Sequence, residues 1–320
     1  AGGDPALIFD TGASNRNCQI LFKDEGTISG GIKYVHDGDK ITFGAGSSST
    51  IQFVIDNNSR ISLSNNDSGG TTNTIFGHTA GNAFVSGAAS NVLIGHESGL
   101  LLGHADNDAN TAVGYNTMKS SGTASNNTAY HNTAIGSDAL AQITTGNDNV
   151  CLGSSAGYAL TTANKVVFIG RQSGDAVTTT GGSNVSDGTV GIGYQALTAL
   201  TSGARNLAIG YTAGGLITDG TDNTLIGYQS GNQGTYGIVG GDYNTGVGAY
   251  SMGASAGAAI TGSSNTAIGY NAMLEAQGAV ANNTAVGATA LQNITTGTTN
   301  TAIGSRALTA ITTGAENTVV

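Results

Sequence analysis

The stretch NTAIGSDAL, from Asn132 to Leu140, recurs through most of the chain and decides its fold. Nearly intact copies begin at Asn265, Asn283 and Asn300. Alignment on the glycine of this motif gives thirteen complete copies, with the glycine at Gly77, Gly95, Gly114, Gly136, Gly153, Gly170, Gly193, Gly210, Gly227, Gly248, Gly269, Gly287 and Gly304. Such regular self-similarity predicts a repeat architecture in which each unit contacts mainly its neighbours.

The spacing of these glycines gives the size of one unit. Successive glycines lie 18, 19, 22, 17, 17, 23, 17, 17, 21, 21, 18 and 17 residues apart, so the base period is 17. The extra residues are rich in Gly, Ser, Asn and Asp, as in TTTGGSNVSD from Thr178 to Asp187, and are typical of loops. A fourteenth copy stops before its glycine and the chain begins without Met, so we expect a processed product or a fragment.

The residues before each glycine predict a short β-strand. The residue before the glycine is Ile, Val, Leu or Phe, and the residue two positions earlier is Thr, Val or Leu. These two positions share one face of a strand, and a residue that is usually Ala faces the other way. We expect a thin interior made of Ala, Thr, Val and Ile. The glycine itself predicts a positive φ, or an approach of another chain that is too close for a Cβ.

Strands this short are stable only when the units stack on one another. Stacking at the β-sheet spacing of about 4.8 Å predicts an all-β rod, a parallel β-roll or β-solenoid about 65 Å long. Eleven of the thirteen units begin with Asn, and Val166 and Thr189 are the exceptions. Stacked Asn side chains predict a hydrogen-bonded ladder at one corner of each coil.

Two further positions of the repeat suggest contacts between chains. The third residue after the glycine is always Ala, Ser or Thr, and the next residue is either Gly or Leu or Met. We interpret the small position as a packing constraint and the Leu or Met as an outward position of a second interface. A homotrimer around a threefold axis fits this interpretation best.

The repeat is similar to two families of fibrous proteins. It resembles the NSxAIGxxA head repeats of trimeric autotransporter adhesins, and more closely the NTAIGxxAL repeats of phage tail fibres. The resemblance covers about Asn73 to Val320, with a longer period than in the adhesins and Thr in place of their usual Ser. It implies a homotrimeric structural protein of the virion, the shaft or the receptor-presenting part of a tail fibre. Its partners would be other fibre or virion proteins and a cell-surface receptor, for which a glycan is a candidate.

The alternative function is the head of a trimeric bacterial adhesin that binds host matrix or glycan at the extracellular cell surface. The residues outside the repeat favour the phage fibre. Residues 1–70 predict an N-terminal segment of short strands and turns, and residues 71–320 form the repeat region. The segment that contains Tyr34, His36 and Phe43 resembles shaft and collar segments of phage fibre proteins.

One short motif suggests an enzyme. The sequence FDTGAS, from Phe9 to Ser14, resembles the active-site loop of aspartic proteases, in which two aspartates share one proton. The other Asp-Ser-Gly tripeptide, at Asp67, follows a polar stretch, so a second catalytic loop is missing from the bilobal pattern. We therefore interpret Asp10 as part of a turn and expect no enzymatic activity and no catalytic residue.

Histidines are the weak candidates for a metal site. His78 and His96 both follow the repeat glycine directly, so stacking would bring their imidazoles together. The same position holds Tyr, Ser or Arg in other units, which favours an outward and variable column without metal. His36 with Asp37 and Asp39 could suggest glycoside hydrolysis, but a chain without Trp offers few aromatics for a sugar groove. We expect no metal and no cofactor.

Composition excludes several other classes. The net charge of −10 and the absence of any basic run argue against nucleic acid as a partner. No apolar stretch is long enough for a membrane span. Cys18 and Cys151 stand in unrelated contexts, so a disulfide is not expected, and Cys151 is interpreted as a small apolar residue.

Overall fold

Short strands build almost all the regular structure of this chain. The structure is a computed structural model that describes residues 18–24, 27–35, 40–45, 51–55, 61–62, 72–177, 186–233, 236–253 and 257–320. These residues form a five-stranded sheet, a fourteen-stranded sheet and a two-stranded hairpin. Within the described ranges the single helical element is the 3-10 turn η1 (Ala124–Asn126). The all-β class predicted from the sequence is therefore confirmed.

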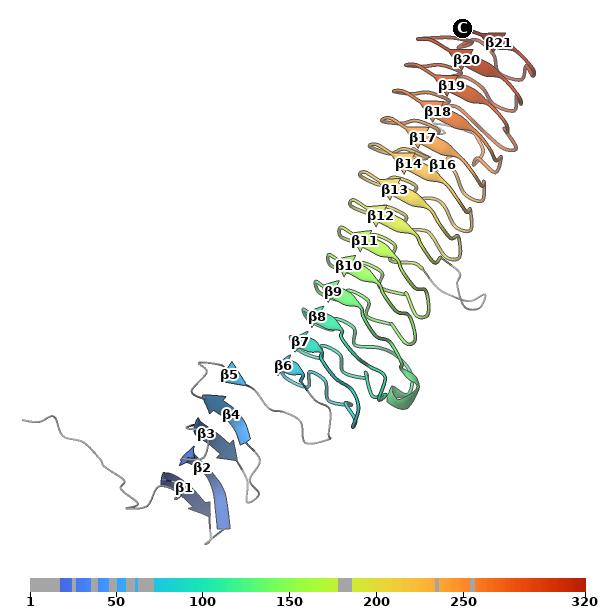
Figure 1. Cartoon of the computed structure of the whole chain (residues 1–320). Coiled ribbons are helices and arrows are strands. Elements are labelled where there is room, and N and C mark those ends of the chain that lie inside the picture. The colour runs from blue at the N-terminus through green and yellow to red at the C-terminus, as the bar shows by residue number, and fades with distance from the viewer. Residues whose placement is uncertain are drawn as a thin grey trace, which may run out of the picture.

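The N-terminal strands form an antiparallel sheet in sequence order (Figure 1). Its strands are β1 (Cys18–Asp24), β2 (Thr27–Val35), β3 (Lys40–Ala45), β4 (Ile51–Ile55) and β5 (Ile61–Ser62). Each strand pairs antiparallel with the next strand in the chain, as the alternation of apolar and polar residues favours. The role of this region as a fibre segment stays a prediction.

The repeat region forms one long parallel sheet with one three-residue strand per coil (Figure 1). Its strands are β6 (Thr74–Phe76), β7 (Val92–Ile94), β8 (Thr111–Val113), β9 (Thr133–Ile135), β10 (Val150–Leu152), β11 (Val167–Ile169), β12 (Val190–Ile192), β13 (Leu207–Ile209), β14 (Thr224–Ile226), β17 (Thr245–Val247), β18 (Thr266–Ile268), β19 (Thr284–Val286), β20 (Thr301–Ile303) and the shorter β21 (Thr318–Val319). Equivalent repeat positions pair in register throughout, for example Thr284 with Thr301. The predicted parallel β-solenoid is confirmed.

Longer units keep this stack intact. The strands β15 (Asn232–Gln233) and β16 (Tyr236–Gly237) form a separate antiparallel hairpin between β14 and β17. Because β14 still pairs directly with β17, the extra residues of this coil leave the sheet and do not break its register. Insertions in a solenoid are tolerated when they project as loops from one coil.

The repeat glycines allow the coils to stack closely. All thirteen have a φ between +126° and +145°, a region that residues with a Cβ rarely adopt. A Cβ added to Gly136 would lie 2.6 Å from the backbone of Gly153 in the next coil. The close neighbour is thus the next coil of the same chain, whereas the sequence left open a second chain.

Three other positions of each coil turn the chain through left-handed backbone. In the coil of Gly136 they are His131, Asp138 and Leu140, with φ of 54°, 59° and 49°. The same positions have positive φ in the other coils, whether Gly or a larger residue stands there. These turns explain why the fourth residue after the glycine is so often Gly, since glycine adopts this conformation without steric cost.

The interior of the coil corrects two interpretations from the sequence. The Leu or Met four residues after the glycine, predicted to point outward, is buried inside the coil at Met118, Leu140, Leu197, Met252, Met273 and Leu291. The small residue before it is buried as well, as at Ala139 and Ser173, so it marks no interface between chains. The left-handed turn redirects the chain at this point, which alternation along a straight strand does not predict.

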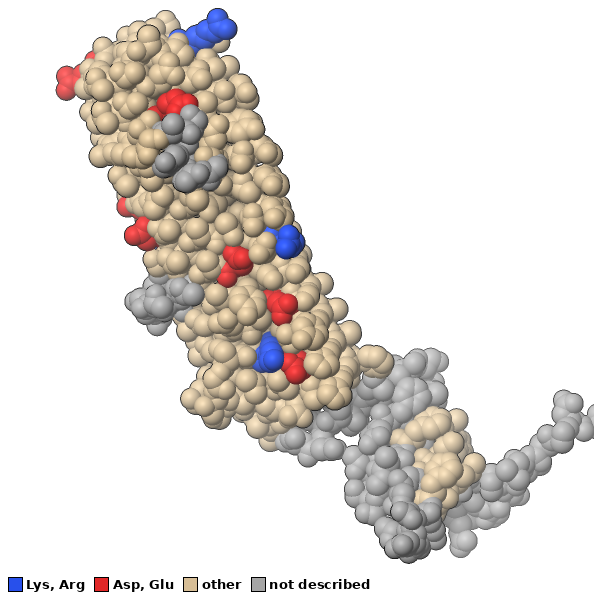
Figure 2. All heavy atoms as spheres, turned by 180° about the vertical axis from the view of Figure 1, so that it is seen from behind, with Lys and Arg blue, Asp and Glu red and all other residues tan. Residues whose placement is uncertain are grey.

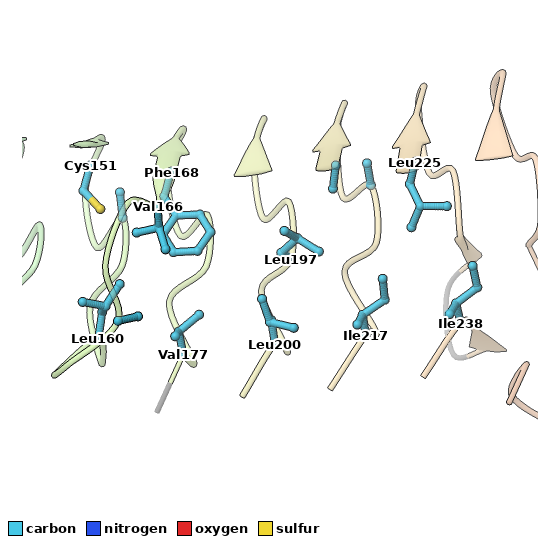
Figure 3. Packing of buried hydrophobic residues seen from close by; sticks show 14 of the residues in the cluster. Cys151, Leu160, Val166, Phe168, Val177, Leu197, Leu200, Ile217, Leu225 and Ile238 are labelled. Atoms are coloured by element: carbon cyan, nitrogen blue, oxygen red, sulfur yellow. The ribbon is translucent and has the colours of Figure 1, made fainter. Parts of the chain in front are cut away.

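The interior is filled from the strand on one side and from the opposite wall on the other (Figure 3). Cys151, Phe168 and Leu225 point inward from the strands, and Leu160 and Ile217 face them from the far side of the coil. Cys151 is free and fully buried, and burial raises the pKa of its thiol, so it remains a neutral, apolar residue as expected.

Two positions of each coil, the strand centre and the turn four residues after the glycine, fill the same interior space. Where the residue two before the glycine is large, as at Leu93 or Phe168, the residue four after the glycine is Gly. Where it is Ala or Gly, the turn position carries Leu or Met, except in the coil of Ala208 and Gly214. A Cβ on Gly174 would lie 2.5 Å from the ring of Phe168, so both positions fill the same space.

Asparagines form a ladder at the corner before the strand. Asn132 is fully buried, and its Nδ2 donates hydrogen bonds to Gly146 O at 2.9 Å and to Asn110 Oδ1 at 3.2 Å. Its Oδ1 accepts the backbone N–H of Asn149 at 3.0 Å. The same pattern holds at Asn265, Asn283 and Asn300, where each side chain ties one coil to the preceding one. The predicted ladder is confirmed and satisfies polar groups that the corner buries.

Candidate functional site

The outer side of the parallel sheet carries one column of large apolar residues and a second column in which Thr predominates over Val and Leu. We call them the aliphatic face: the residue directly before each glycine and the residue three before it. The first column comprises Phe76, Ile94, Val113, Ile135, Leu152, Ile169, Ile192, Ile209, Ile226, Val247, Ile268, Val286 and Ile303. The second holds Thr, Val or Leu at the start of each strand. Neither column contains a charged residue.

The side chains of the aliphatic face are outside the coil. Phe76 is 64% exposed, and Ile135, Ile268 and Ile303 are between 40% and 44% exposed, whereas the residue between the two columns is buried in every complete strand. The prediction from sequence that Thr, Val and Ile fill the interior is wrong for these positions. Alternation shows that two faces exist, but the side with the smaller residues is the one that faces inward here. Most other members of the first column are half-buried, so the outer face is a partly exposed, uncharged strip of the kind that marks an interaction surface.

A third outer column, separate from the aliphatic face, consists of the residue directly after each glycine. In the N-terminal coils, His78 stacks on His96 with ring centroids 5.2 Å apart, and His96 stacks on Tyr115 at 5.4 Å. Further along, Tyr194, Tyr211 and Tyr228 stack at 5.2 Å per step. This column is outward and variable in sequence, as the sequence analysis expected for it.

The weak metal candidates are therefore surface residues in an aromatic stack. Both His78 and His96 are exposed, and they lie with their rings face to face. In the part of the chain that the structure describes, no group of three or more His, Cys, Asp or Glu side chains could hold a metal ion. His104 lies near Asp106 instead, with 3.4 Å between Nδ1 and Oδ2. The expectation of a structure without metal stays a prediction.

Charged side chains are few and scattered over the rod. Figure 2 shows isolated acidic and basic residues on one face, separated by uncharged surface. Lys119 Nζ lies 2.6 Å from Glu97 Oε2, and their hydrogen bond lowers the pKa of Glu97 and raises that of Lys119. Arg205 binds Asp222 through two hydrogen bonds of 2.7 and 2.8 Å, which lower the pKa of Asp222. These pairs join adjacent coils on the surface, where such pairs contribute little to stability.

A second ladder of side chains, which the sequence analysis missed, caps backbone N–H groups between coils. Asp108 Oδ1 accepts the N–H of Ala89 at 2.6 Å, and Asp242 Oδ1 accepts that of Thr221 at 2.7 Å. Asn147 Oδ1 accepts the N–H of Tyr130, and Asn164 Oδ1 accepts that of Asn147, in each case from the preceding coil. All these residues lie two positions before the Asn-ladder position, in a column whose Asp, Asn and Ser content is the signal that could have revealed it.

The residues that suggested an enzyme lie outside the described residues. These are Asp10 and Asp67 of the protease-like motifs and His36, Asp37 and Asp39 of the hydrolase hypothesis. Their assignment to turns stays a prediction. Tyr34 and Phe43 lie in β2 and β3 of the N-terminal sheet.

Among the described residues, no helix has the length and apolar composition that a membrane crossing requires.

Comparisons with protein-family models, with curated proteins and with solved structures give no significant match to this chain.

Proposed function

We propose that this protein is a structural component of a phage tail fibre, its shaft or its receptor-presenting part, and that three copies associate as a homotrimer in the virion. The observation that carries the proposal is the aliphatic face, which runs without a charged residue along every coil of the solenoid. A partly exposed apolar strip of this length is unfavourable in water and is stabilised when a partner covers it.

The periodicity of the face indicates what the partner is. The apolar residues repeat once per coil, at the sheet spacing of about 4.8 Å. A surface that matches this repeat over the whole rod must carry the same repeat, and a second copy of the chain in parallel register does so. Closed symmetry limits the assembly to a small number of copies, and the resemblance of the repeat to trimeric fibres supports three.

The stacked coils suit a load-bearing fibre. Backbone bonds of the sheet, the asparagine ladder and the side-chain caps all run parallel to the rod axis and join each coil to the next. Stretching such a rod along its axis requires many hydrogen bonds between two coils to break together. A fibre that spaces or presents a receptor-binding tip uses these properties directly.

Light scattering tests the assembly. We expect a mass of about three times 31.5 kDa for the intact chain. The double variant Ile268→Asp with Ile303→Asp should shift the mass toward the monomer, because charges would be buried at the interface. The control Asn293→Asp changes an exposed residue of another outer column and should leave the mass unchanged. A stable wild-type monomer with a folded solenoid would overturn the proposal.

A further inference from the structure

Six successive coils carry a continuous row of large side chains on their outer surface. We call it the tyrosine ladder: Arg171, Tyr194, Tyr211, Tyr228, Tyr250 and Tyr270. Arg171 lies over the ring of Tyr194, with its Cζ 5.8 Å from the ring centroid. The next two steps are parallel stacks, and the rings of Tyr228, Tyr250 and Tyr270 then meet edge to face.

Five ladder residues directly follow a repeat glycine, and Tyr250 stands one position later, after Ala249. The solenoid fold does not require these tyrosines. In other coils the position after the glycine holds Ser137, Ser154, Ala288 or Ser305 with the same backbone path. Tyr211, Tyr228 and Tyr270 are 45%, 46% and 56% exposed. Within the described ranges, none of the ladder hydroxyls makes a hydrogen bond to the protein. Tyr194 and Tyr250 are half-buried, so the ladder presents ring edges and hydroxyl groups that a ligand can reach from solvent.

The residues beside the ladder define the chemistry of that ligand. Directly after the tyrosines stand Gln195, Thr212 and Gln229, and Gln195 Nε2 donates a hydrogen bond of 3.2 Å to Gln172 Oε1. Isoleucines of the aliphatic face lie two positions before each of the first three tyrosines. The surface thus combines aromatic rings, hydroxyls and amides, with Arg171 as the one charge of the ladder. This combination suits a neutral ligand rich in hydroxyl groups.

The step of the ladder selects among polymers. Adjacent ring centroids lie 5.2 Å apart in the parallel part, which is close to the length of one hexose unit in an extended glycan. An extended peptide repeats its same-face side chains at about 6.6 Å and would fall out of step. Nucleic acid is disfavoured because the chain carries a net charge of −10.

We propose that the tyrosine ladder binds a neutral, extended polysaccharide whose chain lies parallel to the rod axis. The inference deepens the proposed function and rests on it in one respect, since a fibre component meets glycans at a cell surface. Each sugar unit would contact one coil, so affinity would accumulate over the six coils, as expected for multivalent contacts.

Affinity electrophoresis in gels with hydroxyethylcellulose or galactomannan tests this binding, with dextran, a more flexible glucan, as the comparison polymer. We expect retardation by at least one of the two extended polymers. The variant Tyr211→Ser with Tyr228→Ser should weaken binding at least about tenfold, because two aromatic rings and their phenol hydroxyls are removed from the middle of the ladder. The control Tyr158→Ser removes an exposed tyrosine of a different column and should bind as the wild type.

Two further measurements separate the possible failures. The variant Tyr211→Phe with Tyr228→Phe keeps the ring stack and removes only the hydroxyls, so it should bind more weakly than the wild type even if the serine variant were unstable. Light scattering on the same samples reports the trimer independently. Equal retardation of wild type and both variants, or no retardation of the wild type by either extended polymer, would overturn the ladder proposal while leaving the fibre proposal intact.

Discussion

The coils of Gly170 and Gly287 fill the same interior with different residues. The first places Phe168 at the strand centre and Gly174 at the turn, whereas the second places Ala285 at the strand centre and Leu291 at the turn. Both turns have left-handed backbone, with φ of 58° and 49°. The fold therefore fixes the volume of each coil and the path of its backbone, but either side of the coil can supply the side chain.

The corner before the strand also differs between the two coils. The coil of Gly287 begins with Asn283, which is part of the asparagine ladder, and the coil of Gly170 begins with Val166, which interrupts it. The N–H of Val166 still donates to Asn149 Oδ1 at 3.1 Å, but Val166 lacks both the Nδ2 donor and the Oδ1 acceptor of a ladder asparagine. The coil of Gly170 is therefore held more by apolar packing, and the coil of Gly287 more by hydrogen bonds.

The largest effect should come from a change that breaks the backbone path common to both coils. Gly210→Val would place a Cβ 2.7 Å from the carbonyl carbon of Gly227, at a φ of +140°. We expect a loss of at least about 4 kcal/mol in stability, or no folded solenoid. Thermal denaturation followed by circular dichroism measures it, with Tyr211→Ser as the neighbouring control that should fold. Equal stability of the two variants would refute the close stacking of coils at the repeat glycines.

A swap of side-chain volume sharpens the comparison next. Phe168→Ala alone should destabilise the protein by about 3–5 kcal/mol, because it leaves a cavity in a fully buried position. Gly174→Leu alone should also destabilise it, since the new side chain meets the Phe168 ring. Together they reproduce the pairing of Ala285 with Leu291, so the double variant should recover at least about 2 kcal/mol.

A double-mutant cycle from chemical denaturation checks this coupling. The two changes should show a stabilising interaction energy relative to the sum of their separate effects. Simple additivity would mean that Phe168 and Gly174 do not exchange volume, and the interpretation of the alternating turn position would be lost.

The asparagine ladder gives the third test. Asn283→Val copies the corner of the Gly170 coil into the Gly287 coil. It removes the Nδ2 donor of Gly297 O and the Oδ1 acceptor of the Asn300 N–H, so buried groups lose their partners. We expect a loss of about 2–4 kcal/mol by chemical denaturation. Asn293→Ala, at an exposed position, serves as the control and should change stability little; an equal effect of both would show that the ladder contributes nothing specific.

The smallest effect should come from the outer surface. Asp222→Asn removes the exposed ion pair with Arg205 without touching the interior. The pKa of Asp222 lies below its ordinary value of 3.8 in the folded protein, because Arg205 hydrogen-bonds the carboxylate. The pair therefore stabilises the fold above that pH, and its contribution is lost as the pH falls through the lowered pKa.

Melting temperatures of wild type and Asp222→Asn should thus differ slightly at neutral pH and converge in strong acid. High salt should reduce the neutral-pH difference, because screening weakens exposed pairs. A difference that persisted unchanged in acid would assign the effect to something other than the ion pair.

The repeat, its 17-residue period, the all-β class, the parallel stack and the asparagine ladder could all be predicted from the residues alone. Each of these follows from a pattern that recurs at equivalent positions, such as Asn132 and Asn283, so neighbouring coils must place the same groups side by side. The thirteen glycines likewise predicted an unusual backbone conformation, because a Cβ is absent from the same position of every complete unit.

The side of each element that faces inward could not be predicted in this way and is seen only in the folded coil. Alternation places Ile135 and Ala134 on opposite faces of the strand but does not show which face is buried. The usual preference for large apolar residues in the interior predicts the wrong face. The left-handed residues at the turns, such as Asp138 and Leu140, then rotate the chain so that Leu140 enters the core. The space it fills exists because Ala134 is small, and this balance of volumes across the coil becomes visible only when the two sides are folded against each other.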